Sequence, residues 1–260
     1  MARKIKLYGF TGSNSVYTGR LMLEHKGLEY DFVQLLPAAH AFILLARGFP
    51  TMGAPAMKID GVRYQGTRFI SRALDQLFAD KPLFPADPEQ RRAVEIAERW
   101  GEELQNATRR IFYCASRRDP AAFMSVMGAE RNPVMRGVVV RMAAPIIIRL
   151  ATGIHSASDP YGREDLELLP ERLDQIDAWI AEGVLNGAEL NAADYQIAVN
   201  VSGLMLCEDL APFISGRPAA EHARRVAPDY AGRLGAIIPD EWMAPLRASA
   251  RRQVATQPAP

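Results

Sequence analysis

The sequence is poor in cysteine and has almost no net charge. Only two of its 260 residues are cysteine, Cys114 and Cys207, and each stands alone in an apolar segment. This spacing matches neither a zinc site nor a disulfide framework, so we expect two small core residues and no metal site. The formal net charge is +1, with acidic and basic residues interspersed, which argues against nucleic-acid binding. The arginine pairs 109–110, 117–118 and 224–225 are therefore expected on solvated helix faces.

A long hydrophobic run is also absent. The most apolar stretch, from Val138 to Thr152, is interrupted by Arg141, Pro145 and Arg149, and it is too short for a hydrocarbon layer of about 30 Å. The basic first residues are followed by no apolar segment of the kind that a secretory signal needs. We expect a cytoplasmic protein with no membrane partner, in which 138–152 forms a buried helix.

The first 80 residues alternate between strand and helix patterns. Apolar residues with period two predict strands at 4–10 and 28–33, and an amphipathic helix between them ends at Gly27. A short helix is expected at 40–47. Asp60-Gly61 then joins two short strands as a two-residue hairpin turn, followed by a helix that carries Ile70 and Leu74. This order predicts a small mixed sheet covered by helices.

Pro55 stands at the entrance of the third predicted strand, within Gly53-Ala54-Pro55-Ala56-Met57. A proline there marks a strand entry, an edge or a special bend, because it cannot donate to the sheet. If its peptide bond is cis, the backbone of Ala54 turns outward beside a helix start, which suits a peptide-like ligand with an anionic end. The alternative is an ordinary trans proline between loop and strand.

The composition changes at 81–88, where three prolines predict a linker. Beyond it we find only helical patterns, at 89–116, 134–150 and 164–180. We therefore divide the chain into an N-terminal domain 1–80, a linker 81–88, an all-helical domain 89–250 and a disordered tail 251–260. Asn191 and Asp194 form a capping box before a helix that is apolar nearly all round, which we expect at the centre of the helical domain.

Together these features resemble the cytosolic glutathione transferases, in particular bacterial members of the serine type. The resemblance runs from Lys4 to Leu206 and rests on the order and spacing of five motifs: Lys6-Leu7-Tyr8, Lys26-Gly27, Ala54-Pro55-Ala56-Met57, Asp60-Gly61 and Asn191 to Asp194. It implies an α/β thioredoxin-like N-terminal domain and an all-α C-terminal helical bundle. It also implies a homodimer paired through the N-terminal half, and glutathione as co-substrate.

The resemblance also assigns roles to residues. Pro55 would be cis, and the backbone of Ala54 would pair with the cysteinyl backbone of glutathione. Gly66 and Thr67 would hold the γ-glutamyl carboxylate at a helix N-terminus. Ser13 would activate the thiol, because a hydroxyl donor and the positive end of a helix favour the thiolate. An apolar electrophile would bind between the domains against Phe10, Tyr17, Arg109, Phe112 and Tyr113, and the segment after Ile214, including 216–218 and 237–239, would cover this cleft.

Several alternatives stay open. Ser13 could simply cap a helix, and Asn14 and Ser15 are rivals for its role, whereas Tyr8 is expected to point into the sheet packing. The family's usual Glu or Gln before Thr67 is replaced by Gly66, and Gln65 could substitute only if the loop shifts. Gly53 and Phe49 also depart from the family pattern, and His40 or Arg47 could compensate.

The lack of a cysteine at position 13 disfavours thiol exchange. We therefore expect a transferase that activates a bound thiol for attack on an electrophile, or a lyase or isomerase variant. A ligand-binding protein without chemistry and a regulatory dimer on the same scaffold are the alternatives.

Overall fold

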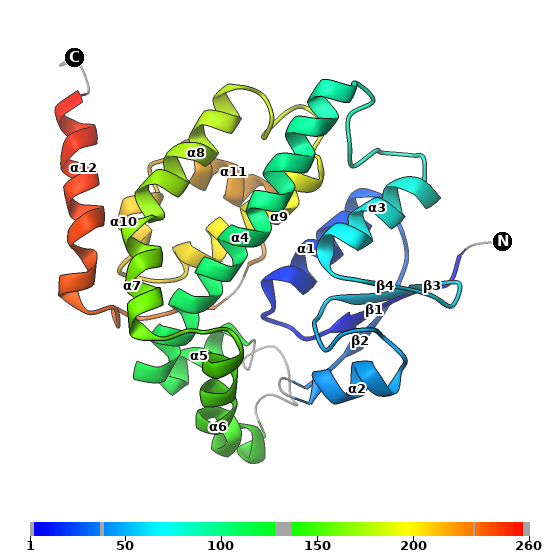
Figure 1. Ribbon diagram of the computed structural model, residues 1–260, viewed down its shortest axis with the longest axis horizontal. Helices are drawn as coiled ribbons and strands as arrows, with labels where there is room; N and C mark the ends of the chain where they lie inside the picture. The colour runs from blue at the N-terminus through cyan, green and yellow to red at the C-terminus, as the bar shows by residue number, and fades with distance from the viewer. Residues whose placement is uncertain (1–2, 37–38, 128–136, 231, 257–260) are drawn as a thin grey trace.

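The sheet and its helices form the N-terminal part of a computed structural model, which describes residues 3–36, 39–127, 137–230 and 232–256. The strands are β1 (Ile5–Gly9), β2 (Asp31–Gln34), β3 (Ala56–Ile59) and β4 (Val62–Gln65), in the order β2-β1-β3-β4. β1 runs parallel to β2 and antiparallel to β3, and β3 runs antiparallel to β4. Helices α1 (Asn14–His25) and α3 (Thr67–Leu77) separate the sheet from the helical part, and α2 (His40–Ala46) lies on the opposite face (Figure 1).

The alternation in β1 explains this layering. Ile5 and Leu7 are buried in the main core with side chains of α1 and α3, whereas Tyr8 is buried with Leu44 and Phe49 on the α2 side. The expectation that Tyr8 points into the sheet packing is therefore confirmed. Successive side chains of β1 therefore pack against different helix layers, because they point to opposite faces of the sheet.

The predicted hairpin turn and helix ends agree with the structure. Asp60 and Gly61 both have positive φ, at 50° and 87°, as a two-residue turn between twisted strands requires. Lys26 is the C-cap of α1, and Gly27 follows it at φ 65°. Asn191 and Asp194 form the predicted capping box of α9 (Ala192–Met205), a helix with twelve buried residues.

The linker is held from both sides. Lys26 lies under it with a fully buried side chain, and its ammonium donates to the carbonyl oxygens of Phe78 at 2.7 Å and Asp80 at 3.1 Å. Asp87 then caps α4 (Pro88–Arg118) by accepting from the backbone of Glu89 and Gln90. The segment itself is fixed through Leu83, whose N–H donates to Oδ1 of Asp75 at 2.8 Å and whose carbonyl oxygen accepts from Ala192 N–H at 2.9 Å.

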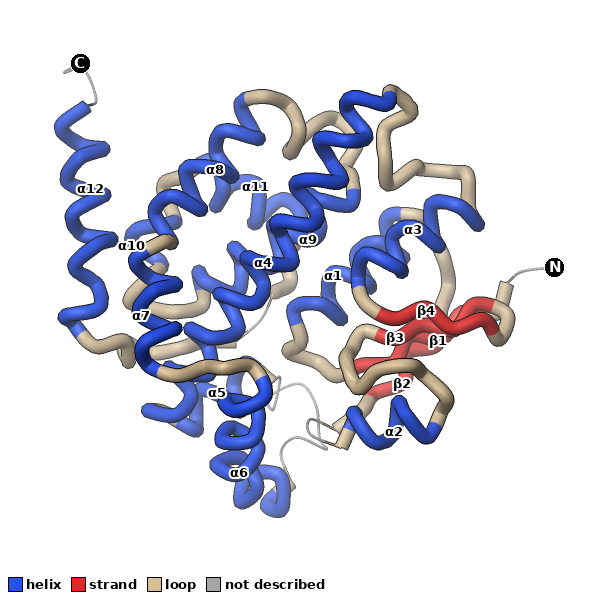
Figure 2. Tube along the Cα trace, in the orientation of Figure 1, coloured by secondary structure: helices blue, strands red, loops and turns tan. Residues whose placement is uncertain are grey.

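The C-terminal part is helical, as predicted. Among the described residues, all strands belong to the N-terminal sheet, and the C-terminal part has one isolated bridge (Figure 2). The central helix α9 packs against α1, α4 and α11. The remaining helices are α5 (Pro120–Val126), α6 (Val138–Ile154), α7 (Asp159–Glu167), α8 (Leu169–Ala181), α10 (Ala211–Ile214), α11 (Pro218–Val226), a 3-10 helix (Asp240–Met243) and α12 (Ala244–Thr256). These elements confirm the fold class: a thioredoxin-like α/β domain followed by a helical bundle.

Three expectations about this part were wrong. The helix expected to be buried at 138–152 is α6, and its side chains Met142, Ile146, Leu150 and Ile154 are 55–77% exposed, because no other described segment covers the face that this four-residue spacing forms. The helix predicted at 164–180 is two helices, α7 and α8, which meet at Leu168 because Pro170 has no N–H to continue the hydrogen-bond ladder. The tail expected to be disordered from 251 continues α12 as far as Thr256, since residues 251–256 contain no glycine or proline. Residues 257–260, and 134–136 of another predicted helix, lie outside the described residues. Within the described residues no helix is both long and apolar enough to cross a membrane.

Candidate thiol and electrophile site

Ser13 lies at the N-terminus of α1, and its hydroxyl does not cap the helix. The residue has the extended backbone of an N-cap, with φ −85° and ψ 119°, but makes no side-chain capping bond. Instead its Oγ lies 3.2 Å from Oγ of Ser15. Ser15 in turn donates to the carbonyl oxygen of Ala54 at 3.1 Å. Two hydroxyls thus connect the positive end of a helix with the backbone before Pro55.

The two rivals of Ser13 have other partners. The Asn14 side chain donates to Oδ1 of Asn200 at 2.9 Å and accepts from the Tyr230 hydroxyl, so it joins α1 to the helical domain. Ser15 is buried, with an exposed fraction of 4%. Ser13 is the more accessible of the two serines and keeps a hydroxyl that can face a ligand.

The other predicted thiol-binding residues come together beside Pro55. The peptide bond between Ala54 and Pro55 is cis, and Gly66 donates its N–H to the Pro55 carbonyl at 2.9 Å. Gly66 is also the N-cap of α3 and offers no side chain to its first turn, which contains no acidic residue. Thr67 begins the helix and is buried. An uncapped helix N-terminus of this kind suits a carboxylate.

The departures from the family pattern are visible around this N-terminus. The Gln65 amide accepts from Thr51 N–H and donates to the carbonyl oxygens of Thr51 and Gly53. It is therefore committed to the loop before Pro55 and does not replace the side chain that Gly66 lacks. Arg47 does not compensate, because its guanidinium lies over the Tyr8 ring, 5.2 Å from the centroid, on the α2 side of the sheet.

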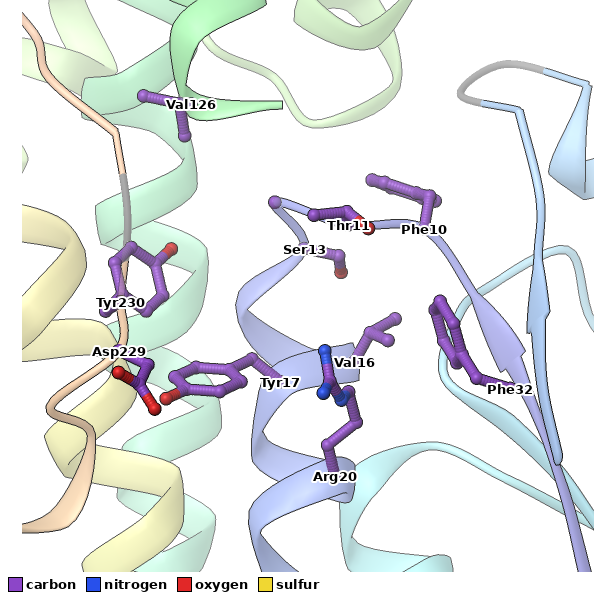
Figure 3. Close-up of a pocket in the computed structure, with 11 residues that line it drawn as sticks. Phe10, Thr11, Ser13, Val16, Tyr17, Arg20, Phe32, Val126, Asp229 and Tyr230 are labelled. Atoms are coloured by element: carbon purple, nitrogen blue, oxygen red, sulfur yellow. The ribbon is translucent and has the colours of Figure 1, made fainter. Parts of the chain in front are cut away.

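A cavity of about 90 Å³ lies beside the Ser13 loop (Figure 3). Of the residues expected to bind the electrophile, Phe10 and Tyr17 line this cavity. Its full lining is Phe10, Thr11, Gly12, Ser13, Val16, Tyr17, Arg20, Phe32, Val126, Asp229 and Tyr230. Burial and the nearby Asp229 carboxylate raise the pKa of Tyr17, so its phenol stays protonated and can donate at neutral pH.

The loop that carries Ser13 packs closely against α5. Gly12 has φ +88°, and a Cβ at this position would lie 2.4 Å from the carbonyl oxygen of Val126. Only glycine allows both the backbone conformation and the close approach. This contact was not predicted, because neither α5 nor its distance from the loop could be inferred from local sequence patterns.

Arg109, Phe112 and Tyr113 lie outside this cavity, so the expected electrophile-binding set divides into two groups. Phe112 stacks with Phe123 at a centroid distance of 6.0 Å, and Tyr113 lies parallel to the His155 ring at 5.4 Å. Burial, Arg109 and His40 lower the pKa of His155 to about 4. The imidazole is therefore neutral at physiological pH.

The expectation that the 109–110 pair lies on a solvated face was wrong. Arg110 makes two hydrogen bonds to the buried Asp165 carboxylate, at 2.6 and 2.8 Å, and Arg109 is partly buried beside it. Helical spacing shows which residues share a face but does not show which faces a second helix covers.

The chain after Ile214 covers the site only in part. Asp229 and Tyr230 line the cavity beside Ser13, and Tyr230 contacts Tyr17 at a centroid distance of 5.6 Å. The 237–239 segment, expected over the cleft, packs instead against α4 and α7 near Trp242, where Asp209 accepts from the N–H groups of Ile237 and Ile238. That part of the expectation was wrong. Asp229, Tyr230 and Val126 were not predicted as site residues, since no motif marks them.

The two cysteines behave as predicted. Both are free and buried, and burial raises their thiol pKa values, that of Cys207 to about 11. Among the described residues no cluster of three histidine, cysteine or carboxylate side chains could hold a metal ion.

Comparison with known families matches residues 7–82 to the model described as "Glutathione S-transferase, N-terminal domain". A search of curated proteins found no significant match. Many solved structures share the fold.

Three of these structures span nearly the whole chain. A glutathione S-transferase from Rhodospirillum rubrum F11 is 18% identical, with 85% of this chain and 87% of that one covered and a TM-score of 0.59. The β-etherase LigF from Sphingobium sp. strain SYK-6 is 17% identical, with 98% and 96% covered and a TM-score of 0.57. A Methylobacterium radiotolerans JCM 2831 glutathione S-transferase in complex with glutathione sulfonate is 16% identical, with 91% and 98% covered and a TM-score of 0.55.

Proposed function

We propose that this chain, a glutathione S-transferase family member by its N-terminal domain and its fold, joins glutathione to an electrophilic carbon. In this reaction the thiolate sulfur forms a bond to the carbon, and the leaving group departs with the electron pair of the broken bond. Displacement of a halide and cleavage of an ether are both reactions of this type. The protein's task is to supply the thiolate and to align the electrophile with it.

The observation that carries the proposal is the position of the Ser13 hydroxyl, whose hydrogen points to Ser15 and can rotate to a bound sulfur. It lies at the positive end of α1, outside any capping bond, and beside Ser15, which is bonded to Ala54. A sulfur placed there would accept a hydrogen bond from Ser13 and gain from the helix dipole. Both effects favour the thiolate over a thiol with a normal pKa of about 8.5.

The rest of the tripeptide would extend along the edge formed by Pro55 and α3. The Ala54 backbone would pair with the cysteinyl residue. The N–H groups in the first turn of α3, which begins at Thr67 and has no side-chain cap, would donate to the γ-glutamyl carboxylate. Because Gly66 adds no side-chain contact, we expect affinity to be weaker than that of a site with a full set of donors, by about 1–3 kcal/mol for each missing buried contact.

Calorimetry and steady-state kinetics on wild-type protein and Ser13→Ala test the proposal. We expect glutathione to bind both proteins with similar affinity, and turnover of 1-chloro-2,4-dinitrobenzene to fall at least about tenfold in the variant. Unchanged turnover would remove Ser13 from the mechanism. No binding heat at millimolar glutathione would overturn the proposed activity and favour a binding role without this co-substrate.

The proposal includes a homodimer in the cytoplasm. Two apolar side chains of the N-terminal domain are largely exposed, Val62 of β4 at 56% and Phe69 of α3 at 72%, and a second copy would cover them. The two free cysteines suit a reducing compartment. Light scattering of wild type and Phe69→Asp tests the pairing, which we expect the introduced charge to weaken.

A further inference from the structure

Arg109 differs from Arg91 and Arg110, the other partly buried arginines of α4, because no carboxylate among the described residues forms an ion pair with it. Arg91 pairs with Glu95 at 3.2 Å, and Arg110 pairs with Asp165. Arg109, although partly buried, makes one side-chain hydrogen bond within the described part of the chain, to Oδ1 of Asn106 at 3.2 Å. A guanidinium shielded from water and left without an anion is costly to keep, and a bound anion would remove that cost.

The described ring side chains near Arg109 are flat and uncharged at neutral pH. Tyr113, one turn along α4, interacts with Arg109 electrostatically and stacks on His155. Burial lowers the pKa values of His155 and His40, so both imidazoles are neutral at physiological pH. The charge of this group is therefore that of Arg109 alone.

The group spans both domains and adjoins the Ser13 loop. His40 of the N-terminal domain contacts the Phe10 ring at 5.0 Å, and the Phe10 carbonyl accepts from Ser13 N–H at 3.3 Å. On the other side, Gly203 of α9 lies between Asn14 and Thr108. A Cβ on Gly203 would be 3.1 Å from Asn14 Nδ2 and 3.6 Å from Thr108 Cγ2. The α4 segment that carries Arg109 is thus beside the start of α1.

We propose that Arg109, with Tyr113 and His155, binds the carboxylate end of an aromatic electrophile and so determines substrate specificity. The guanidinium offers a planar pair of N–H donors that fits a carboxylate. The rings of Phe10, Tyr113 and His155 offer faces for an aromatic ring. That the ligand is the electrophile rests on the proposed function. Binding of the ligand at Arg109 can be measured without turnover.

The test compares 3,5-dinitrobenzoate with 3,5-dinitrobenzamide, which have the same ring and no leaving group and differ in charge. Calorimetry measures the binding of both to wild type, Arg109→Met, Arg109→Lys and Arg99→Met. Arg99 is exposed on the same helix, so its variant removes one positive charge away from the site.

We expect wild type to prefer the carboxylate by about tenfold to 100-fold, the range of a charge-assisted hydrogen bond. The preference should vanish in Arg109→Met, persist in part in Arg109→Lys and remain whole in Arg99→Met. Equal affinity of wild type for both compounds, no binding of either, or a preference that survives Arg109→Met would overturn the inference. Melting curves with a common shape establish that the variants are folded.

Failure of this inference differs from failure of the proposed function. Turnover of 4-chloro-3,5-dinitrobenzoate and of its amide with glutathione is measured in parallel. Turnover of both at equal rates would support the transferase and contradict the role of Arg109. Charge-selective binding without turnover would support the Arg109 site and contradict the transferase.

Discussion

Glu98 joins the two domains, and its removal should destabilise the protein strongly. The carboxylate is fully buried on α4. It accepts from the Ser71 hydroxyl at 2.6 Å and from Arg72 Nη1 at 2.5 Å, both on α3. The Arg72 guanidinium also lies over the Phe84 ring, 4.1 Å from its centroid. One buried anion therefore fixes α3, whose N-terminus forms part of the candidate thiol site, against the first helix of the bundle.

The magnitude follows from what each variant leaves behind. Glu98→Ala leaves a cavity and a partly buried Arg72 without its closest anion, which should cost about 3–5 kcal/mol. Glu98→Gln keeps an acceptor for Ser71 and loses the charge, so we expect about 1–2 kcal/mol. Arg72→Met should cost about 2–3 kcal/mol, limited because burial already raises the pKa of Glu98 and the carboxyl can protonate when its partner is lost.

Urea unfolding of the single variants and of Glu98→Gln/Arg72→Met forms a double-mutant cycle. We expect a coupling energy of at least about 1 kcal/mol, because both substitutions remove the same interaction. Arg99→Met, at an exposed position on the same helix, serves as the control and should change stability by less than about 0.5 kcal/mol. Additive losses in the cycle, or a cost of Glu98→Ala below about 1 kcal/mol, would refute the reasoning.

Three further predictions concern neighbouring contacts. Gly12→Ala should destabilise the fold by about 1–3 kcal/mol and lower the melting temperature, because the alanine methyl group would collide with the Val126 carbonyl oxygen. An unchanged melting curve would contradict the close packing of the Ser13 loop against α5. Lys26→Met should cost about 2–4 kcal/mol in urea unfolding, because it leaves the carbonyl oxygens of Phe78 and Asp80 without their donor. A loss under about 0.5 kcal/mol would show that water replaces the ammonium group. The pKa of His155 is about 4 in the folded protein, against an ordinary value of 6.5. Between about pH 6.5 and pH 4 the unfolded chain therefore binds more protons than the folded protein, and the free energy of unfolding should fall as the pH drops through this range. His155→Phe should remove up to about 3 kcal/mol of that fall, and an unchanged pH profile would contradict the pKa.

The sequence was most informative where local chemistry determines local structure. Asp60-Gly61 predicted its hairpin because two positive φ angles favour these residues, and Asn191 with Asp194 predicted the start of α9 because the box satisfies backbone N–H groups directly. The hydrophobic alternation around Leu7 and Tyr8 predicted a strand, and the structure shows a helix layer on each face.

The sequence was less informative where the outcome depends on contacts between distant segments. Asp229 and Tyr230 reach the cavity from a loop more than 200 residues after Ser13, and nothing near them indicates this position. The pairing of Arg110 with Asp165 likewise depends on how α4 meets α7. The residues that the N-terminal domain contributes to the candidate site were therefore predicted, because their motifs are local. The prediction was incomplete for the residues that the helical domain contributes.

The central claim is that Ser13 stabilises a thiolate at the N-terminus of α1. The most direct measurement is the pH titration of the ultraviolet thiolate absorbance of glutathione bound to wild type, Ser13→Ala and Tyr8→Phe. We predict a thiol pKa at least about one unit below its free value of about 8.5 in wild type and in Tyr8→Phe, whose phenol is buried on the α2 side of the sheet. In Ser13→Ala the pKa should return toward the free value. An unshifted pKa in wild type, or an equal shift in Ser13→Ala, would contradict the claim.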